Sequence, residues 1–218
     1  SICKDGEILS NVISSQIIHS EFGGVVPEIA SREHERMLNT IAYKAIEDSK
    51  IKIIDIEGIA VTNGPGLAGA LLTGVSFAKG LALGLGVKII SINHLEAHII
   101  ANLLDKSDID YPFLCLLVSG GHTQIWLIKK LGDYILLGES RDDAAGEAFD
   151  KGARILGLGY PGGPEIEKHA VGGNHKLVDF PRALINNGKI EFSFSGLKTS
   201  LLYFMDSFKE TSDIRFED

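Results

Sequence analysis

A chain of 218 residues with 44% hydrophobic and 23% charged residues can bury a core, as one large domain or as two smaller ones. The net charge of −8 argues against a protein that coats nucleic acid through charge alone. Apolar stretches such as 89–92 and 113–118 have the length of strands, so we expect no membrane span, and the first residues predict no signal peptide.

The two cysteines, Cys3 and Cys115, fall in apolar, strand-like segments. We expect both to be buried thiols in a reducing compartment, which favours the cytoplasm.

The first half of the chain alternates between strand-like and helix-like patterns. Residues 1–18 predict a β-hairpin with its turn at 4–7. Apolar residues at helical spacing after Pro27 predict a helix to about Ser49. His34 lies among charged residues of this helix and is interpreted as a solvated side chain, with contact to a partner as the alternative.

The alternation continues with a strand at 56–62, an apolar helix at 67–85 and a strand at 87–92. The glycines of the 67–85 helix lower its helix propensity, so this helix must pack closely against other elements. Together these elements predict an α/β fold, a sheet covered by helices.

Two histidines, His94 and His98, stand four residues apart in a predicted helix that runs to about Leu104. They project from one face, and imidazole suits zinc or iron, so the pair is a candidate metal half-site that needs a further ligand. Solvated histidines are the alternative. Glu96 lies roughly 200° round the helix from His94, which argues against a zinc peptidase, where the catalytic Glu adjoins a ligand histidine.

An apolar strand at 113–118 runs into the glycine turn Ser119–His122, and further strands are predicted at 124–128 and 134–137. Two glycines flanked by hydroxyls let backbone N–H groups approach an anion closely. A plain hairpin turn is the alternative.

Acidic residues mark the next helix. Asp142 and Asp143 precede its predicted start, where either is expected to cap it. Asp150 falls inside the helix, where an acid that faces a cleft can accept hydrogen bonds from a sugar hydroxyl. A rigid Gly/Pro loop at 157–164 leads to another helix start. The remaining stretches are predicted to be irregular at 173–190, helical at 200–208 and a polar tail at 211–218.

Taken in order, these motifs resemble the family of tRNA threonylcarbamoyladenosine transferases, in its bacterial TsaD branch. Each motif is modest alone, but together they extend over essentially the whole chain. The motifs are Asn63–Leu67, Lys79–Leu81, Asn93–His98, Leu117–Thr123, Asp142–Lys151, Tyr160–Pro164 and Phe192–Lys198.

The resemblance implies the fold of actin, Hsp70 and sugar kinases, in which a nucleotide cleft separates two α/β lobes. The first lobe is expected at 1–107 and the second at 108–218. The family pattern also has a strand before Ser1 and a long part after Asp218, which carries an Asn that contacts the ligand and the Asp that is the third protein ligand of the metal.

The same resemblance implies two sets of site residues. The histidines matching His94 and His98 bind one divalent metal ion, iron or zinc, and two histidines without the carboxylate should hold it poorly. The residues expected to contact the adenylate ligand are Leu117, Val118, Ser119, Gly120, Gly121, Asp150, Gly163 and Glu167.

The implied reaction is transfer of a threonylcarbamoyl group from threonylcarbamoyl-AMP to the N6 amine of the adenosine beside the anticodon in tRNAs that read ANN codons. No catalytic side chain is assigned. The implied partners are tRNA, a paralogous TsaB-type subunit and a small TsaE-type ATPase, and no membrane. A non-catalytic nucleotide-binding scaffold subunit of the same tRNA-modification complex and a metallopeptidase, the older label for this family, are the alternatives.

Overall fold

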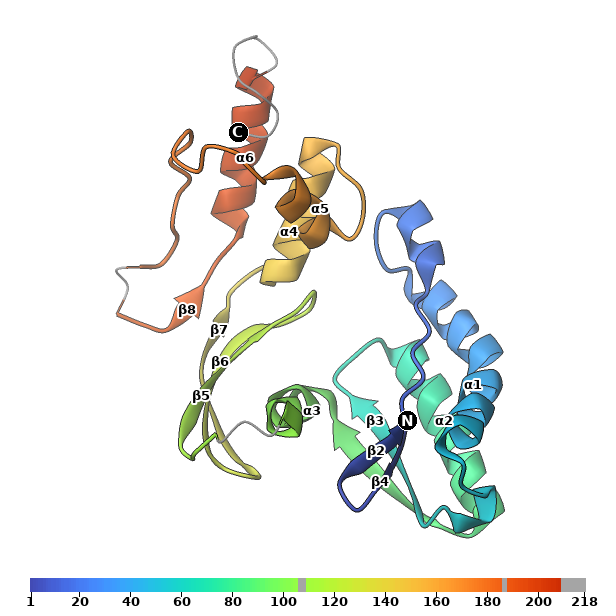
Figure 1. Cartoon of the computed structure of the whole chain (residues 1–218). Coiled ribbons are helices and arrows are strands. Elements are labelled where there is room, and N and C mark those ends of the chain that lie inside the picture. Colours follow the sequence, from blue (N-terminus) through green and yellow to red (C-terminus); the bar gives the residue numbers. More distant parts are fainter. Residues whose placement is uncertain (106–108, 186–187, 209–218) are drawn as a thin grey trace. The chain divides into compact units, whose positions relative to one another are not determined.

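The computed structural model describes residues 1–105, 109–185 and 188–208, so the predicted polar tail at 211–218 lies outside the described residues. The chain divides into two compact units, Ser1–Leu104 and Asp105–Asp218, and each is described by itself (Figure 1). Both units combine helices with strands, so the protein is of the mixed α/β kind.

The first unit opens with the predicted hairpin, formed by β1 (Ile2–Lys4) and β2 (Glu7–Ser10). Its turn residues Asp5 and Gly6 have φ of 51° and 82°, as a two-residue hairpin turn requires. The second strand is shorter than predicted, because the chain leaves the hairpin after Ser10 and forms the short helix η1 (Ile17–Phe22). Cys3 is exposed, which corrects the expectation of a buried thiol.

Helix α1 (Pro27–Ser49) has the predicted bounds, with proline in its first turn. It packs on α2 (Ala68–Leu85), and the hairpin packs on α1 in turn (Figure 1). The two helices bury small residues, Ala30 and Ala45 in α1 and Ala78 and Ala82 in α2.

Strands β3 (Gly58–Gly64) and β4 (Lys88–Asn93) are parallel, and α2 is the crossover between them. The short helix η2 (Ile53–Asp55) precedes β3. Helix α3 (His94–Ala101) begins directly after β4 and continues as η3 (Asn102–Asp105). The histidine pair therefore starts at the carboxyl end of a parallel strand, where α/β proteins place their ligands.

Helix α2 alone among the described helices is long and apolar enough to cross a membrane by length and composition, whereas the sequence was expected to contain only shorter apolar stretches. Core helices of soluble proteins also have this property, but they are mostly buried, whereas 11% of this helix is buried inside the structure. In this fold α2 packs on α1, β3 and β4.

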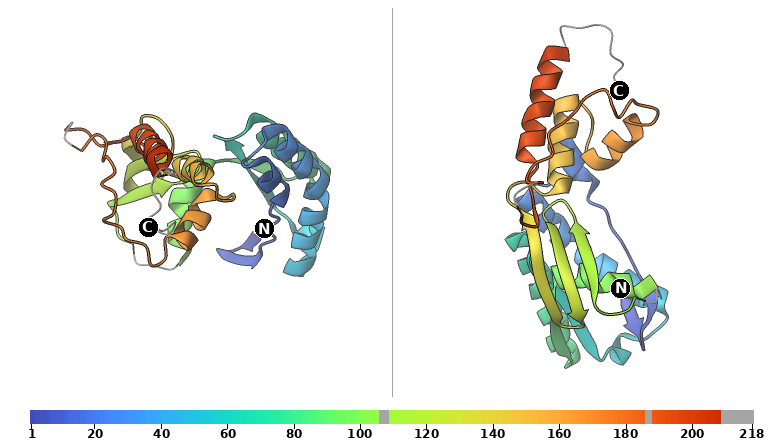
Figure 2. Two further views of the ribbon diagram at one scale, coloured as in Figure 1. Left: turned by 90° about the horizontal axis from the view of Figure 1, so that it is seen from above. Right: turned by 90° about the vertical axis from the view of Figure 1, so that its left-hand side faces the viewer.

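The second unit is built on a four-stranded sheet of order β5-β6-β7-β8. Strands β5 (Phe113–Val118), β6 (Thr123–Lys130) and β7 (Asp133–Ser140) form an antiparallel meander, seen as the twisted yellow-green sheet in Figure 2. Strand β8 (Glu191–Phe192) was not predicted and lies parallel to β7.

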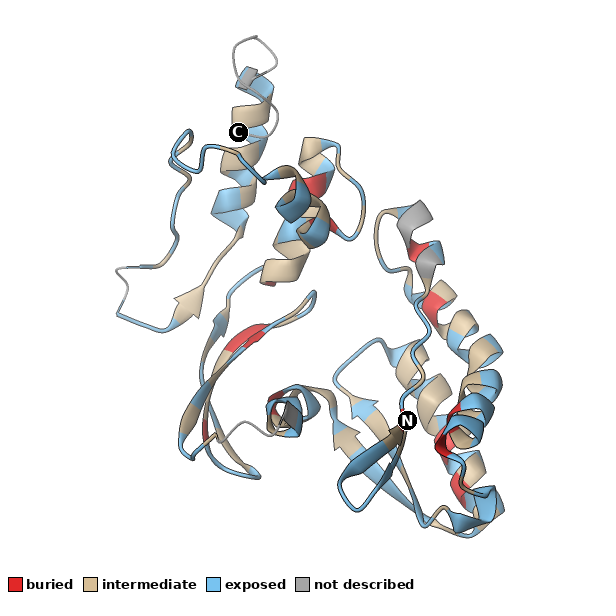
Figure 3. Cartoon of the chain, in the orientation of Figure 1, coloured by how far each residue is buried: buried red, intermediate tan, exposed pale blue. Residues whose placement is uncertain are grey.

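Three helices follow the meander: α4 (Ala145–Leu156), α5 (Gly162–His169) and α6 (Ser195–Phe208). Both α5 and α6 pack on α4. Helix α6 starts at Ser195, five residues before the predicted start at 200. Buried residues gather in β6 and around α4 (Figure 3), so the core of this unit lies beside the glycine turn.

Candidate functional site

The glycine turn joins β5 to β6, and the Ser119 side chain holds it closed. The Ser119 N–H donates to the His122 carbonyl at 2.8 Å. The Ser119 hydroxyl oxygen accepts the N–H groups of Gly121 at 3.3 Å and His122 at 3.0 Å. One of the two glycine N–H groups predicted to face an anion is therefore bound inside the turn.

The start of helix α4 is built directly against this turn. The Gly146 N–H donates to the Ser119 carbonyl at 3.1 Å. A β-carbon at position 146 would lie within 2.7–2.9 Å of the Ser119 oxygen and the Gly120 backbone, so only glycine fits there. The Ala145 N–H donates to the Thr123 hydroxyl oxygen at 2.8 Å. The first turn of α4 is thus satisfied by the hairpin rather than by its own preceding residues.

The prediction that Asp142 or Asp143 caps α4 was therefore wrong. The Asp142 carboxylate accepts the Ser193 hydroxyl and the Phe194 N–H, immediately before α6. Burial raises the pKa of Asp142, but the hydrogen bonds from Ser193 and from backbone N–H groups outweigh it and hold the pKa below its ordinary value.

Asp143 points to two lysines instead. Its carboxylate lies 2.6 Å from the Lys151 ammonium group in α4 and 3.5 Å from that of Lys198 in α6. The hydrogen bonds that Lys151 donates to Asp143 and Glu147 raise its pKa. These pairs connect the Asp142–Lys151 and Phe192–Lys198 motifs, which lie far apart in the sequence.

Asp150 and Gly162 join α4 to α5. Asp150 Oδ1 accepts the Gly162 N–H at 2.7 Å, so this acid satisfies the first residue of α5. A β-carbon at position 162 would lie 2.5–2.8 Å from Phe149 and neighbouring atoms of α4, which again requires glycine. Burial, and then the charge of Asp150, raise the pKa of Tyr160 in the connecting loop.

Two contacts with α4 lie near the predicted ligand residues of the second unit, one at the glycine turn and one at the start of α5. Gly146 and Asp150 are four residues apart, so the glycine turn and the start of α5 adjoin the same side of the helix. Gly163 lies in the first turn of α5, and Glu167, which is exposed, follows it on the same face of that helix. Leu117 is buried, whereas Val118 is 53% exposed.

Gly120 and Gly121 differ from Gly146 and Gly162 in what surrounds them. A β-carbon at either position would meet no atom of the chain within 4 Å, and neither residue has a left-handed φ. The fold therefore does not require glycine at these two positions. In the part of the chain that the structure describes, no acceptor binds the Gly120 N–H.

The histidine pair lies in the first unit. His94 and His98 have ring centroids 4.6 Å apart, on one face of α3. Asn93 caps this helix, because its side-chain oxygen accepts the N–H groups of Leu95 and Glu96. The two rings are in edge-to-face contact, with an interplanar angle of 71°, so they lie side by side as the predicted metal pair requires.

The described residues do not form a complete metal site. Among residues 1–105, 109–185 and 188–208, no group of three or more His, Cys, Asp and Glu side chains is placed to hold an ion. The metal-binding role of this pair stays a prediction. That the pair shares a cleft with the glycine turn also stays a prediction, since the two sets of residues belong to separate units.

Three side chains whose structural roles the sequence did not predict hold much of this site together. Thr123 and Ser119 belong to a recognised motif, and their position beside two glycines was a usable signal. Lys198 also belongs to a recognised motif, Phe192–Lys198, but nothing local in the sequence indicates its pairing with Asp143 in a distant motif.

These features define a mixed α/β protein with a glycine turn set against the start of a helix. Residues 7–216 match the sequence family TsaD, described as tRNA N6-adenosine threonylcarbamoyltransferase, and the chain belongs to this family.

Relatives that carry the same name agree. The protein of Kosmotoga olearia is 52% identical over 219 residues, which cover 100% of this chain and 65% of that protein. That of Clostridium botulinum strain Hall is 51% identical over 201 residues, or 92% and 59% of the two chains. Clostridium perfringens strain SM101 has a relative that is 52% identical over the same shares. The chain thus spans about three fifths of the length of these relatives.

Proposed function

We propose that the protein transfers a threonylcarbamoyl group from threonylcarbamoyl-AMP to the N6 amine of the adenosine beside the anticodon, in tRNAs that read ANN codons. The observation that carries this proposal is the open pair Gly120 and Gly121. Their lack of side chains serves no need of the fold, whereas a ligand that approaches the backbone does need it. Membership of the family supplies the identity of that ligand.

The proposal includes the architecture. The units are proposed to be the two lobes of an actin, Hsp70 and sugar-kinase type of fold, 1–107 and 108–218, with the nucleotide cleft between them. The mixed α/β composition of each unit is consistent with this arrangement.

The adenylate is proposed to bind along the face of α4 described above. Thr123 and Ser119 already take the first two N–H groups of the helix, so Gly120 supplies the backbone donor for the phosphate. Asp150 uses Oδ1 for Gly162 and has Oδ2 to accept a ribose hydroxyl. Glu167, exposed one turn beyond Gly163, is proposed to accept a second hydroxyl.

In the reaction, the N6 nitrogen of adenosine attacks the carbamoyl carbon. The bond from that carbon to the phosphate oxygen breaks, AMP leaves with the electron pair, and the nitrogen loses a proton. A divalent ion held by His94 and His98 would polarise an oxygen of the substrate. Because the mixed anhydride is already activated, the contribution of the chain's own residues is mainly to position the two reactants.

The same proposal places the protein in the cytoplasm, with tRNA, a TsaB-type paralogue and a TsaE-type ATPase as partners. The experiment supplies purified protein and these partners with threonylcarbamoyl-AMP labelled in the carbamoyl carbon, and with tRNA that lacks the modification. Nucleoside mass spectrometry should find the label on adenosine, with one AMP released per transfer. Label that remains in free threonylcarbamoyl products, with no modified adenosine, would contradict the proposal.

A further inference from the structure

A chain of hydrogen bonds in the first unit ends at His34. The Val26 N–H donates to Nδ1 of His19, whose side chain is 6% exposed. His19 must then carry its proton on Nε2, which lies 2.8 Å from the Gln16 side-chain oxygen. The Gln16 amide is thereby oriented, so that its NH₂ group faces the Ala30 carbonyl at 3.3 Å and His34 Nδ1 at 3.4 Å.

The consequence concerns the other nitrogen of His34. Because Nδ1 accepts from Gln16, the neutral imidazole carries its proton on Nε2. The His34 ring is exposed, so this N–H is available as a donor of fixed orientation. The partner that selects this tautomer is the half-buried Gln16, which is itself oriented by the buried His19.

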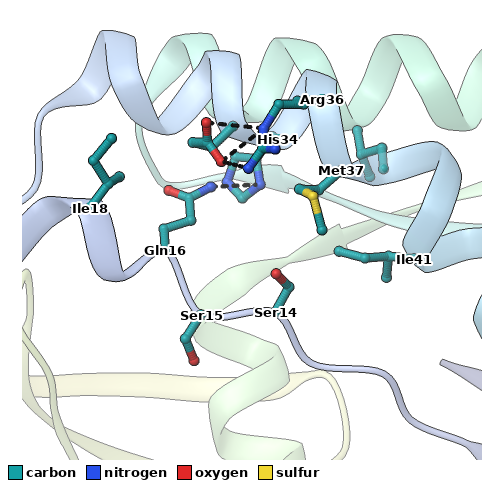
Figure 4. A pocket seen from close by; sticks show the side chains of 10 residues that line it. Ser14, Ser15, Gln16, Ile18, His34, Arg36, Met37 and Ile41 are labelled. Carbon is teal, nitrogen blue, oxygen red and sulfur yellow. Dashed lines mark hydrogen bonds and ion pairs between the residues drawn. The ribbon is translucent and has the colours of Figure 1, made fainter.

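Gln16 and His34 line a hollow of about 270 Å³. Figure 4 shows Met37 and Ile41 of α1 on one side of it and Ser14 on the facing segment. This volume is slightly below the roughly 300–1,000 Å³ of sites that take a drug-sized molecule, so it suits a single ring system.

The charge of the lining excludes a simple anion site. Glu33 and Arg36 both line the hollow, and they bond to each other at 2.6 Å, so their charges cancel. What remains is a set of hydroxyl, amide and imidazole groups beside aliphatic side chains. That combination suits a neutral heterocycle with hydrogen-bonding edges and apolar faces.

The location is also informative. Gln16 and His34 border a second hollow of about 440 Å³, whose lining includes Thr62 of β3. Thr62 pairs with Ile92 of β4, two residues before His94. The hydrogen-bond chain from His19 through Gln16 to His34 therefore lies near the carboxyl ends of the parallel strands, the same edge from which α3 starts.

We propose that the hollow lined by Ser14, Gln16, His34 and Met37 binds a purine base, with His34 Nε2–H donating to a ring nitrogen. This inference deepens the proposed function, on which its biological meaning rests: the purine would be the acceptor adenine. The binding itself can be tested without the reaction.

The test measures binding of adenosine to the purified protein by NMR, with ¹⁵N-labelled histidine. Adenosine should shift the His34 Nε2 resonance, and His34→Phe, which keeps a ring of similar shape, should weaken binding about fivefold, the typical effect of one lost hydrogen bond. His175→Phe changes an exposed histidine of the second unit and should leave affinity unchanged.

A second variant tests the hydrogen-bond chain from His19 through Gln16 to His34. Gln16→Glu presents His34 with a carboxylate oxygen in place of an amide donor, so the His34 proton should move to Nδ1, a change visible in the ¹⁵N spectrum. Adenosine affinity should fall together with it. An unchanged tautomer, or a changed tautomer with full affinity, overturns the proposal.

Two further outcomes separate this proposal from the proposed function. If inorganic phosphate shifts His34 and adenosine does not, the hollow is an anion site and the proposal fails, whether or not tRNA is modified. If adenosine binds at His34 but no modified adenosine forms in the labelled assay, the base site stands and the proposed function fails.

Discussion

The Asp142 carboxylate accepts the Phe194 N–H at 2.8 Å, a bond between residues 52 positions apart. It joins the end of β7 to the start of α6, and the Ser193 hydroxyl donates to the same carboxylate. The backbone assists, since the Arg141 N–H donates to the Phe192 carbonyl at 2.9 Å. Asp142 therefore serves a helix distant in sequence in the way that a capping residue serves its own.

Replacing this acid should destabilise the second unit. Asp142→Ala removes the acceptor of two donors, and the loss of such a cap typically costs about 1 kcal/mol of unfolding free energy. Urea denaturation followed by circular dichroism measures it. Asp179→Ala, at an exposed position in an irregular segment, is the control and should change stability by less than about 0.5 kcal/mol. Equal effects of the two substitutions would show that Asp142 does not act as a cap.

The same acid should make stability depend on pH. Its pKa is lowered in the folded protein, so between that value and the unfolded value of about 3.9 the unfolded chain binds more protons. Its stabilising contribution is thus complete above about pH 4 and is lost as the pH falls through the folded pKa. Asp142→Asn should flatten the acid limb of a plot of unfolding free energy against pH, and an unaltered slope would contradict this reasoning.

Gly146 and Gly120 should respond in opposite ways to a methyl group. Gly146→Ala drives a β-carbon into backbone atoms of the glycine turn and should cost about 1–3 kcal/mol, despite the better helix propensity of alanine. In Gly120→Ala the added β-carbon has no atom within 4 Å, so the free energy of unfolding should stay within about 0.5 kcal/mol of the original. The affinity of this variant for threonylcarbamoyl-AMP, measured by calorimetry, should fall at least tenfold. Unchanged affinity would remove Gly120 from the ligand site.

Thr123 should matter through its hydroxyl alone. Thr123→Val keeps the shape of a buried side chain but leaves the Ala145 N–H without its acceptor, which should cost about 1–3 kcal/mol. Thr40→Val, on the exposed side of α1, is the matched control. Hydrogen exchange adds a local readout, since the first turn of α4 should lose protection before the rest of the helix.

The histidine pair should behave as one unit toward metal. His94→Ala and His98→Ala should each lower zinc retained after dialysis to a similar extent, because one imidazole alone is a poor ligand set. Elemental analysis by mass spectrometry measures the retained metal. His175→Ala should leave it unchanged. If one of the two variants keeps the original metal content, the rings do not share an ion.

Much of the fold could be predicted from local pattern. Helix α1 has the predicted bounds because its proline start and apolar spacing are properties of the segment itself. Strand β8 could not be predicted, because two residues carry no periodicity and their pairing depends on β7. The second hairpin strand ended early for a related reason: β-branched residues favour extension, but the chain after Ser10 has no strand to pair with in the described structure.

The candidate site also has features that local pattern predicts and features that depend on the tertiary structure. The glycine turn and the histidine face were predictable from spacing. The roles of Asp142 and Thr123 were not, because the cap of α4 comes from β6 and the acid expected to provide it serves α6. The sequence shows that a side chain is able to cap a helix, but only the tertiary structure shows which helix it caps.

The contact between the glycine turn and α4 combines a main-chain hydrogen bond, from the Gly146 N–H to the Ser119 carbonyl, with one side-chain acceptor, the Thr123 hydroxyl. This contact depends on a hydroxyl at position 123 and on the lack of a β-carbon at position 146, and on few other side chains. Residues that contact a ligand beside the glycine turn are therefore free to change during evolution while the backbone keeps its shape. Ligand specificity and fold then change independently.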